Sequence, residues 1–140
     1  MAKIQIEFPA EFKFSTDIPV RITDLNYGGH VGNDTILSII HEARAQFFQH
    51  YGYNENDFGG VRTIMGNVMI NYRKELFYGD VVQAFVSAIN ISRASFDVVY
   101  LLKKSDSVVV AEAQTGMVCF DYVRKKVVSI PDAVKNVLSQ

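Results

Sequence analysis

One long helical pattern, followed almost entirely by strand-like segments, is the feature that most constrains the fold. From Val31 to about Tyr51 the apolar residues recur at spacings of three and four, which is the period of an amphipathic helix. The apolar positions are Ile36, Leu37, Ile40, Ala43, Phe47 and Tyr51, and Ile39 and Phe48 widen their face. So wide a face predicts a helix that is buried on most sides. Gly52 and Gly59-Gly60 are expected to end the helix and begin a loop.

The remaining segments are rich in β-branched and aromatic residues that alternate with period two. Strands are predicted at residues 20–23, 61–72, 81–91, 94–103 and 108–121, with a short one after the turn at 124–126 and a terminal helix at 131–138. Consecutive strands with short turns predict an antiparallel meander. The expected fold class is therefore α+β, with a long central helix wrapped by a curved antiparallel sheet, in one domain over residues 1–140.

Charge and cysteine content exclude several classes of protein. The formal net charge is −1 without basic blocks, so binding to nucleic acid through bulk charge is not expected. Cys119 is the only cysteine, which rules out an internal disulfide and favours a reducing compartment. The sequence carries no apolar run of membrane-spanning length, and its first residues lack the apolar core of a signal peptide. We therefore expect a soluble, cytoplasmic protein without a membrane partner.

A polar turn at residues 21–34 lies directly before the helical pattern. It contains Asp24, Asn26, His30 and Asn33, together with the pair Gly28-Gly29. The free backbone N–H groups at a helix N-terminus bind electron-rich groups, so polar side chains at this point predict a binding or catalytic site. Only three histidines occur and none has a metal-ligand spacing, so no metal is expected.

The order of these segments resembles the hotdog fold, and in particular the 4-hydroxybenzoyl-CoA thioesterase-like (acyl-CoA thioesterase) family. The family pattern Asp-x-Asp-x-x-Gly-His-Val-Asn-Asn is similar to residues 24–33, Asp-Leu-Asn-Tyr-Gly-Gly-His-Val-Gly-Asn. Residues 42–44, Glu-Ala-Arg, match the family's helix, and residues 71–80, 91–96 and 118–121 resemble its later segments in the right order. The resemblance covers nearly the whole chain.

This resemblance implies hydrolysis of an acyl-CoA thioester by carboxylate-assisted attack of water, without a cofactor, since CoA is part of the substrate. It also implies a homodimer or homotetramer with the site at the subunit interface. The helix-start N–H groups near Gly32 and Asn33 would hold the thioester carbonyl, Gly29 would allow its close approach, and Arg93 would contact the CoA arm. Whether the thiol carrier is CoA or a carrier protein stays open.

One departure from the family pattern concerns the base. The family's second Asp, its usual nucleophile or base, falls on Asn26, and a carboxamide cannot accept a proton at neutral pH. Asn26 is therefore expected to position water or substrate, with Asp24 as the first candidate base and Glu42 as the second. His30 and Asn33 are expected to shape the site.

Simpler explanations exist for the same residues. Asp24 and Asn26 are common in turns, and His30 would equally well bind a backbone carbonyl. Glu42 and Arg44 would suit a solvated helix edge or an interface, and Cys119 a buried apolar strand. The loss of the Asp also permits two other functions, a non-hydrolytic acyl-CoA or acyl-carrier binding module and a hotdog dehydratase acting on a 3-hydroxyacyl thioester.

Overall fold

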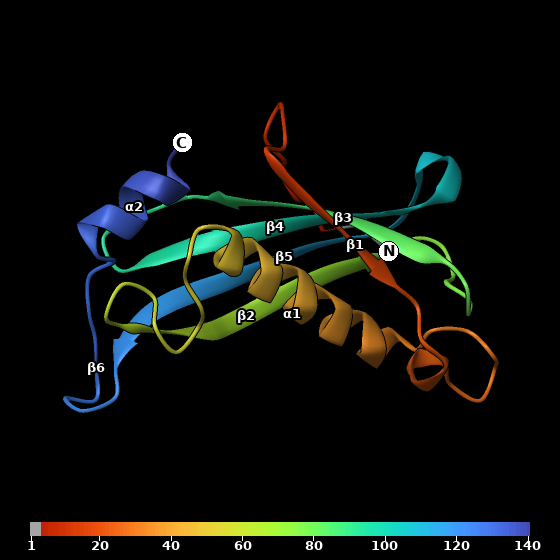
Figure 1. The fold of residues 1–140 in the computed structure, drawn as a ribbon, viewed down its shortest axis with the longest axis horizontal. Helices are drawn as coiled ribbons and strands as arrows, with labels where there is room; N and C mark the ends of the chain where they lie inside the picture. The colour runs from red at the N-terminus through yellow and green to blue at the C-terminus, as the bar shows by residue number, and fades with distance from the viewer. Residues whose placement is uncertain (1–3) are drawn as a thin grey trace.

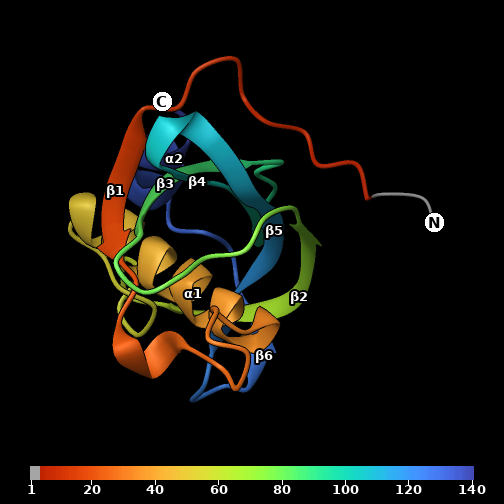
Figure 2. The same cartoon turned by 90° about the vertical axis from the view of Figure 1, so that its right-hand side faces the viewer.

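The computed structural model describes residues 4–140 and contains one long helix and one antiparallel sheet (Figure 1). The elements in chain order are β1 (Phe14–Pro19), a 3₁₀ turn (Ile22–Asp24), α1 (Asn33–His50), β2 (Arg62–Tyr72), β3 (Val81–Ile89), β4 (Ser95–Lys104), a 3₁₀ turn (Ser105–Ser107), β5 (Val108–Asp121), β6 (Lys126–Val127) and α2 (Asp132–Leu138). The sheet curls around α1, and Figure 2 shows β1, β3, β4, β5 and β2 arranged as an arc around that helix. The predicted hotdog fold, an α+β arrangement, is confirmed.

The strand order is β1-β3-β4-β5-β2, with β6 paired to β5. The predicted meander is confirmed for β3, β4 and β5 but is wrong for β2, which pairs with β5 and lies at the sheet edge. The connection from β2 to β3 must therefore cross the open end of the sheet. It is held there by hydrogen bonds from Arg73 N–H to Val110 O, at 2.9 Å, and from Val20 N–H to Asp80 O, also at 2.9 Å.

The first strand lies earlier than predicted. A strand was expected at residues 20–23, but β1 ends at Pro19 and residues 22–24 form a 3₁₀ turn. The turn forms because Asp24 Oδ2 accepts the N–H of Arg21 at 2.8 Å while Asp24 N–H donates to Arg21 O at 2.9 Å. Pro19 is tolerated because β1 is an edge strand and the proline is its last residue.

The core lies between α1 and the concave face of the sheet. The four residues predicted to share one face of β4, namely Phe96, Val98, Tyr100 and Leu102, are all at most 1% exposed. On α1 the apolar face that the spacing predicted is buried at Ile36, Ile40, Ala43 and Phe47. Leu37 is 38% exposed, and the prediction of a helix buried on most sides is wrong, because the sheet covers only one side of α1. Within residues 4–140, no helix is long and apolar enough to cross a membrane.

Candidate active site at the start of α1

The polar turn is folded by Asn26. Its side-chain Oδ1 accepts the N–H of Gly28 at 2.8 Å, and its backbone N–H donates to His30 O at 2.8 Å. Gly29 N–H donates to Asn26 O at 3.1 Å, and Gly29 has a φ of +78°, which a residue with a side chain adopts only at a cost. These bonds reverse the chain and bring the imidazole of His30 back beside Gly28.

The start of α1 is left uncapped by side chains. Gly32 occupies the N-cap, directly before Asn33, and among residues 4–140 no side chain caps it. Gly32 O accepts the N–H groups of Thr35 and Ile36, so the N–H groups of Asn33 and Asp34 have no acceptor within the helix. A Cβ placed on Gly32 would lie 3.7 Å from Asn26 Nδ2, so this amide donor adjoins the helix start.

His30 adjoins the same point. A Cβ placed on Gly28 would lie 3.3 Å from both Asn26 Oδ1 and His30 Nε2, so the two side chains converge. His30 Nδ1 lies 3.1 Å from Val31 O, and Nε2 lies 3.8 Å from Glu75 Oε1. Because a carbonyl oxygen only accepts, Nδ1 carries the proton, and Nε2 is an acceptor in the neutral ring.

A cavity of about 330 Å³, here called the helix-start cavity, opens beside these groups. Its polar lining consists of His30, Asn33, Tyr72, Arg73, Lys74 and Glu75, and its apolar lining of Val31, Ile36, Leu76 and Val110. The loop from β2 to β3 is tied to the helix start because Val31 N–H donates to Leu76 O at 2.8 Å and Tyr72 OH donates to Asn33 O at 3.1 Å. The sequence analysis did not select Glu75, because no local pattern brings residue 75 near residue 30.

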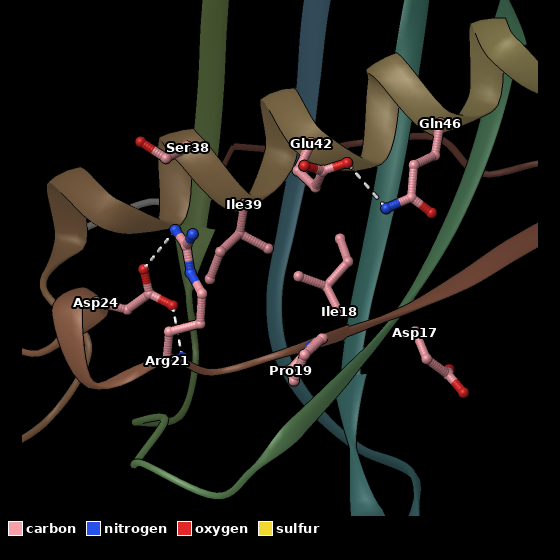
Figure 3. Close-up of a pocket in the computed structure, with 9 residues that line it drawn as sticks. All are labelled: Asp17, Ile18, Pro19, Arg21, Asp24, Ser38, Ile39, Glu42 and Gln46. Atoms are coloured by element: carbon pink, nitrogen blue, oxygen red, sulfur yellow. Dashed lines mark hydrogen bonds and ion pairs between the residues drawn. The ribbon is translucent and has the colours of Figure 1, made fainter.

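The two carboxylates predicted as bases line a different cleft, between β1 and α1, of about 270 Å³ (Figure 3). Asp24 is buried at one end, where its two oxygens accept hydrogen bonds from the backbone N–H and the guanidinium of Arg21. Glu42 is exposed at the other end and accepts the side-chain N–H of Gln46 at 2.9 Å. Ile39 lies between Asp24 and Glu42 in Figure 3, and Ile18 lies below Glu42 in that view. The structure thus brings Asp24 and Glu42 to one cleft, and His30 and Asn33 to another.

Arg93 lies away from both cavities. It belongs to the turn between β3 and β4, which lies beside α2 and opposite the start of α1 (Figure 1). Its side chain donates to Ser129 Oγ at 2.8 Å, and its carbonyl accepts the N–H of Ile130 at 2.8 Å. These contacts hold the C-terminal segment against the turn.

Arg44 is not on a solvated helix edge. It is 4% exposed, and its guanidinium donates to Glu55 Oε1 at 2.8 Å and to Tyr100 OH at 3.2 Å. Tyr100 OH in turn lies 2.7 Å from Thr115 Oγ1, and burial raises the pKa of Tyr100, which keeps the hydroxyl protonated at neutral pH. This network ties α1 to β4 and β5. Within residues 4–140, no cluster of three or more His, Cys, Asp or Glu side chains is arranged to hold a metal.

Comparison with known sequences identifies the family. A sequence profile described as the thioesterase-like superfamily matches residues 20–138, which is most of the chain. The chain belongs to the thioesterase-like superfamily. The family and the thioesterase class that the polar turn and the segment order predicted are thereby confirmed.

Relatives and solved structures agree with this assignment. The chain is 30% identical over 121 residues to a protein of Aquifex aeolicus (strain VF5) that bears an esterase name, covering 85% of this chain and 92% of that one. It is 27% identical over 120 residues to a 1,4-dihydroxy-2-naphthoyl-CoA hydrolase of Microcystis aeruginosa, covering 84% and 86%. A thioesterase of Thermus thermophilus, solved with coenzyme A and Zn, has the same fold at a TM-score of 0.81 and 22% identity, covering 93% of this chain and 100% of that chain.

Proposed function

We propose that the protein hydrolyses an acyl-CoA thioester to the free acid and CoA, without a cofactor, at the start of α1. The observation that carries this proposal is the uncapped helix start with Asn26 Nδ2 beside it. Family membership supports thioester hydrolysis. The activity in the name of the Microcystis relative and the coenzyme A in the Thermus structure support a CoA thioester.

In this proposal the thioester carbonyl accepts hydrogen bonds from the N–H groups of Asn33 and Asp34 and from Asn26 Nδ2. These donors are fixed by the turn before the carbonyl arrives, so they stabilise the oxyanion that forms when water attacks without further reorganisation. Loss of one such donor typically costs about 100-fold or more in kcat. Gly29 and Gly32 add no side chain that would keep the carbonyl from the backbone.

In this proposal the base is not one of the two cleft carboxylates of the same chain. Both oxygens of Asp24 are already hydrogen-bonded to Arg21, and the carboxylate is buried. Glu42 lies nine residues beyond Asn33 on α1, which at the helical rise is about 14 Å from the helix start. Asp24 is therefore assigned to folding the turn, and Glu42 to the surface of the β1–α1 cleft.

The CoA phosphates are assigned to the basic residues around the helix-start cavity. Arg73 and Lys74 line this cavity, and Lys104 Nζ donates to Glu75 O at 3.1 Å. A diphosphate crossing the rim would meet these cations, whereas Arg93 lies beside α2. Cytoplasmic localisation is part of the proposal and is supported by the free thiol of Cys119.

The proposed assembly is a homodimer formed through β2, and two such dimers would pair into a tetramer. This strand is at the sheet edge, and a further cavity of about 300 Å³ between β2 and α1 is lined by Asn33, Asp34, Leu37, Val68, Ile70 and Tyr72. A second copy paired along β2 would fill this cavity and border the helix start. Leu37→Arg is expected to yield monomers in size-exclusion chromatography with light scattering; an unchanged assembly would exclude this interface.

The test of the function is release of CoA thiol from short, medium, long and aromatic acyl-CoAs. Turnover above background with one preferred acyl class supports the proposal. Tight binding of a non-hydrolysable acyl-CoA without turnover of any member would instead support a binding module. Formation of a 2-enoyl thioester from a 3-hydroxyacyl-CoA would instead support a dehydratase, with His30 as its local histidine.

A further inference from the structure

We propose that Glu75 and His30 together bind and activate the attacking water, so that Glu75 supplies the carboxylate that Asn26 lacks. This inference rests on the proposed hydrolysis and names its base. Both side chains line the helix-start cavity, together with Asn33 at the start of α1. The imidazole is 30% exposed and the carboxylate 63% exposed, so both can reach a bound water.

The ring of His30 is oriented for this role. Its Nδ1–H donates to Val31 O at 3.1 Å, which fixes the tautomer and leaves Nε2 as an acceptor. The ring of Phe77 packs edge-on against the imidazole, and the centroids of the two rings are 6.5 Å apart. The ring therefore presents its basic nitrogen to Glu75 and to the neighbourhood of Asn26.

The separation of the two acceptors suits one shared water. His30 Nε2 and Glu75 Oε1 are 3.8 Å apart, which is too long for a direct hydrogen bond but allows a water to donate one hydrogen to each. Asn26 Oδ1 and His30 Nε2 are each 3.3 Å from the Cβ position of Gly28, so both side chains border this glycine. The carbonyl held at the helix start would then be within reach of the water.

The other charged groups around this pair come from the β2–β3 loop, β4, β5 and α1. Arg73 and Lys74 line the same cavity from the β2–β3 loop, and Arg73 is paired with Glu112 of β5 at 2.6 Å. Lys104 of β4 donates to the backbone carbonyl of Glu75, and Asp34 lies in the first turn of α1. Glu75 is the carboxylate nearest to His30 Nε2 among the ion pairs of residues 4–140.

The chemical step follows from these positions. His30 Nε2 takes one proton from the water while the water oxygen bonds to the thioester carbon, and the carbonyl electron pair moves onto its oxygen. When the tetrahedral intermediate collapses, the C–S bond breaks and the proton passes from Nε2 to the departing sulfur. The products are the carboxylic acid and CoA thiol, and Glu75 remains an anion throughout.

The experiment compares Glu75→Gln and His30→Gln with the wild type on the acyl-CoA that the panel selects. Each variant is expected to lose roughly 100-fold in kcat with little change in KM. His30→Gln is also expected to lose the acid limb of the pH–rate profile. Glu11 is an exposed glutamate that lines a separate cavity near the C-terminal end of α1. Glu11→Gln is therefore the matched control, and its kcat should equal that of the wild type. Melting temperatures verify that each variant is folded.

A second variant tests the role of the carboxylate itself. Glu75→Asp keeps a carboxylate on the β2–β3 loop and should retain at least tenfold more kcat than Glu75→Gln. Wild-type kcat in Glu75→Gln would overturn this inference while leaving the proposed hydrolysis intact. Equal losses in Glu75→Gln and in Glu75→Asp would overturn the assignment of Glu75 as the missing carboxylate. If the wild type releases no thiol from any thioester, the proposed function fails, and this inference fails with it.

Discussion

Replacing Tyr100 by Phe removes one oxygen from the centre of the network that joins α1 to the sheet. Tyr100 is fully buried, and its hydroxyl accepts from Arg44 Nη1 at 3.2 Å and shares a 2.7 Å hydrogen bond with Thr115 Oγ1. The only other contact of Arg44 Nη1 among the described side-chain hydrogen bonds is Met65 Sδ at 4.0 Å. The variant therefore leaves a buried charged donor and a buried hydroxyl with poor partners.

The magnitude follows from these two bonds. A hydrogen bond to a charged group contributes about 1.5–3 kcal/mol and a neutral one about 1 kcal/mol, so Tyr100→Phe should lower the free energy of unfolding by roughly 2–4 kcal/mol. For a chain of this length that is roughly 6–12 °C in Tm. No cavity larger than a hydroxyl is created, so packing adds little to the loss.

Urea unfolding followed by circular dichroism measures the change, with Tyr122→Phe as the matched control because Tyr122 is 49% exposed. The double variant Tyr100→Phe, Thr115→Val should cost less than the sum of the single variants, since it removes both partners of one bond. The network would be refuted as the link between α1 and the sheet if Tyr100→Phe lowered the free energy of unfolding by less than about 0.5 kcal/mol. It would also be refuted if the loss in the double variant equalled the sum of the losses in the single variants.

Three further perturbations test other parts of the molecule. Burial raises the pKa of the Cys119 thiol from 9.0 to about 11, so the thiol ionises at lower pH in the unfolded chain than in the folded one. The free energy of unfolding should therefore fall as the pH rises from 9 to 11. Urea unfolding across this range should show a smaller fall in Cys119→Ala than in the wild type. Gly32→Ala places a Cβ 2.6 Å from Asp34 Oδ1, and by disturbing the helix start it should lower kcat/KM roughly 10- to 100-fold. Gly66→Ala is the control, because its Cβ would lie 3.9 Å from the nearest atom, Gly116 O, and its kcat/KM should not change. Asp24→Ala removes the acceptor for Arg21 N–H and should cost about 1 kcal/mol in urea unfolding; unchanged stability would mean that the 3₁₀ turn does not depend on it.

Most of the fold could be predicted from hydrophobic periodicity. The helix was expected from Val31 to about Tyr51 and is found at Asn33–His50, and the alternation in residues 94–103 correctly identified the buried face of β4. Periodicity reports which face of a strand is buried, but it carries no information about which strand lies next to it. For this reason β2 was placed beside β3, although it pairs with β5.

The candidate site was predicted only where it is local in sequence. Residues 24–33 fold as one turn, so Asn26, His30 and the helix start could be grouped from their spacing. The environments of Asp24 and Arg44 depend on tertiary packing. A carboxylate held by Arg21 and a guanidinium enclosed by Glu55 and Tyr100 have no signature in the chain itself.

The wrong strand order and the overlooked Glu75 have one physical cause. In a simple meander, residues 73–80 would form a tight turn joining adjacent strands, and nothing would bring them to α1. Because β2 and β3 lie at different places in the sheet, this segment must cross the open end of the arc, where α1 begins. The crossing seats Leu76 against Val31 and leaves Glu75 3.8 Å from His30. A chain with Asn in place of the family's Asp can therefore supply a carboxylate to the same helix start from its crossover loop, without any change in the helix or the turn.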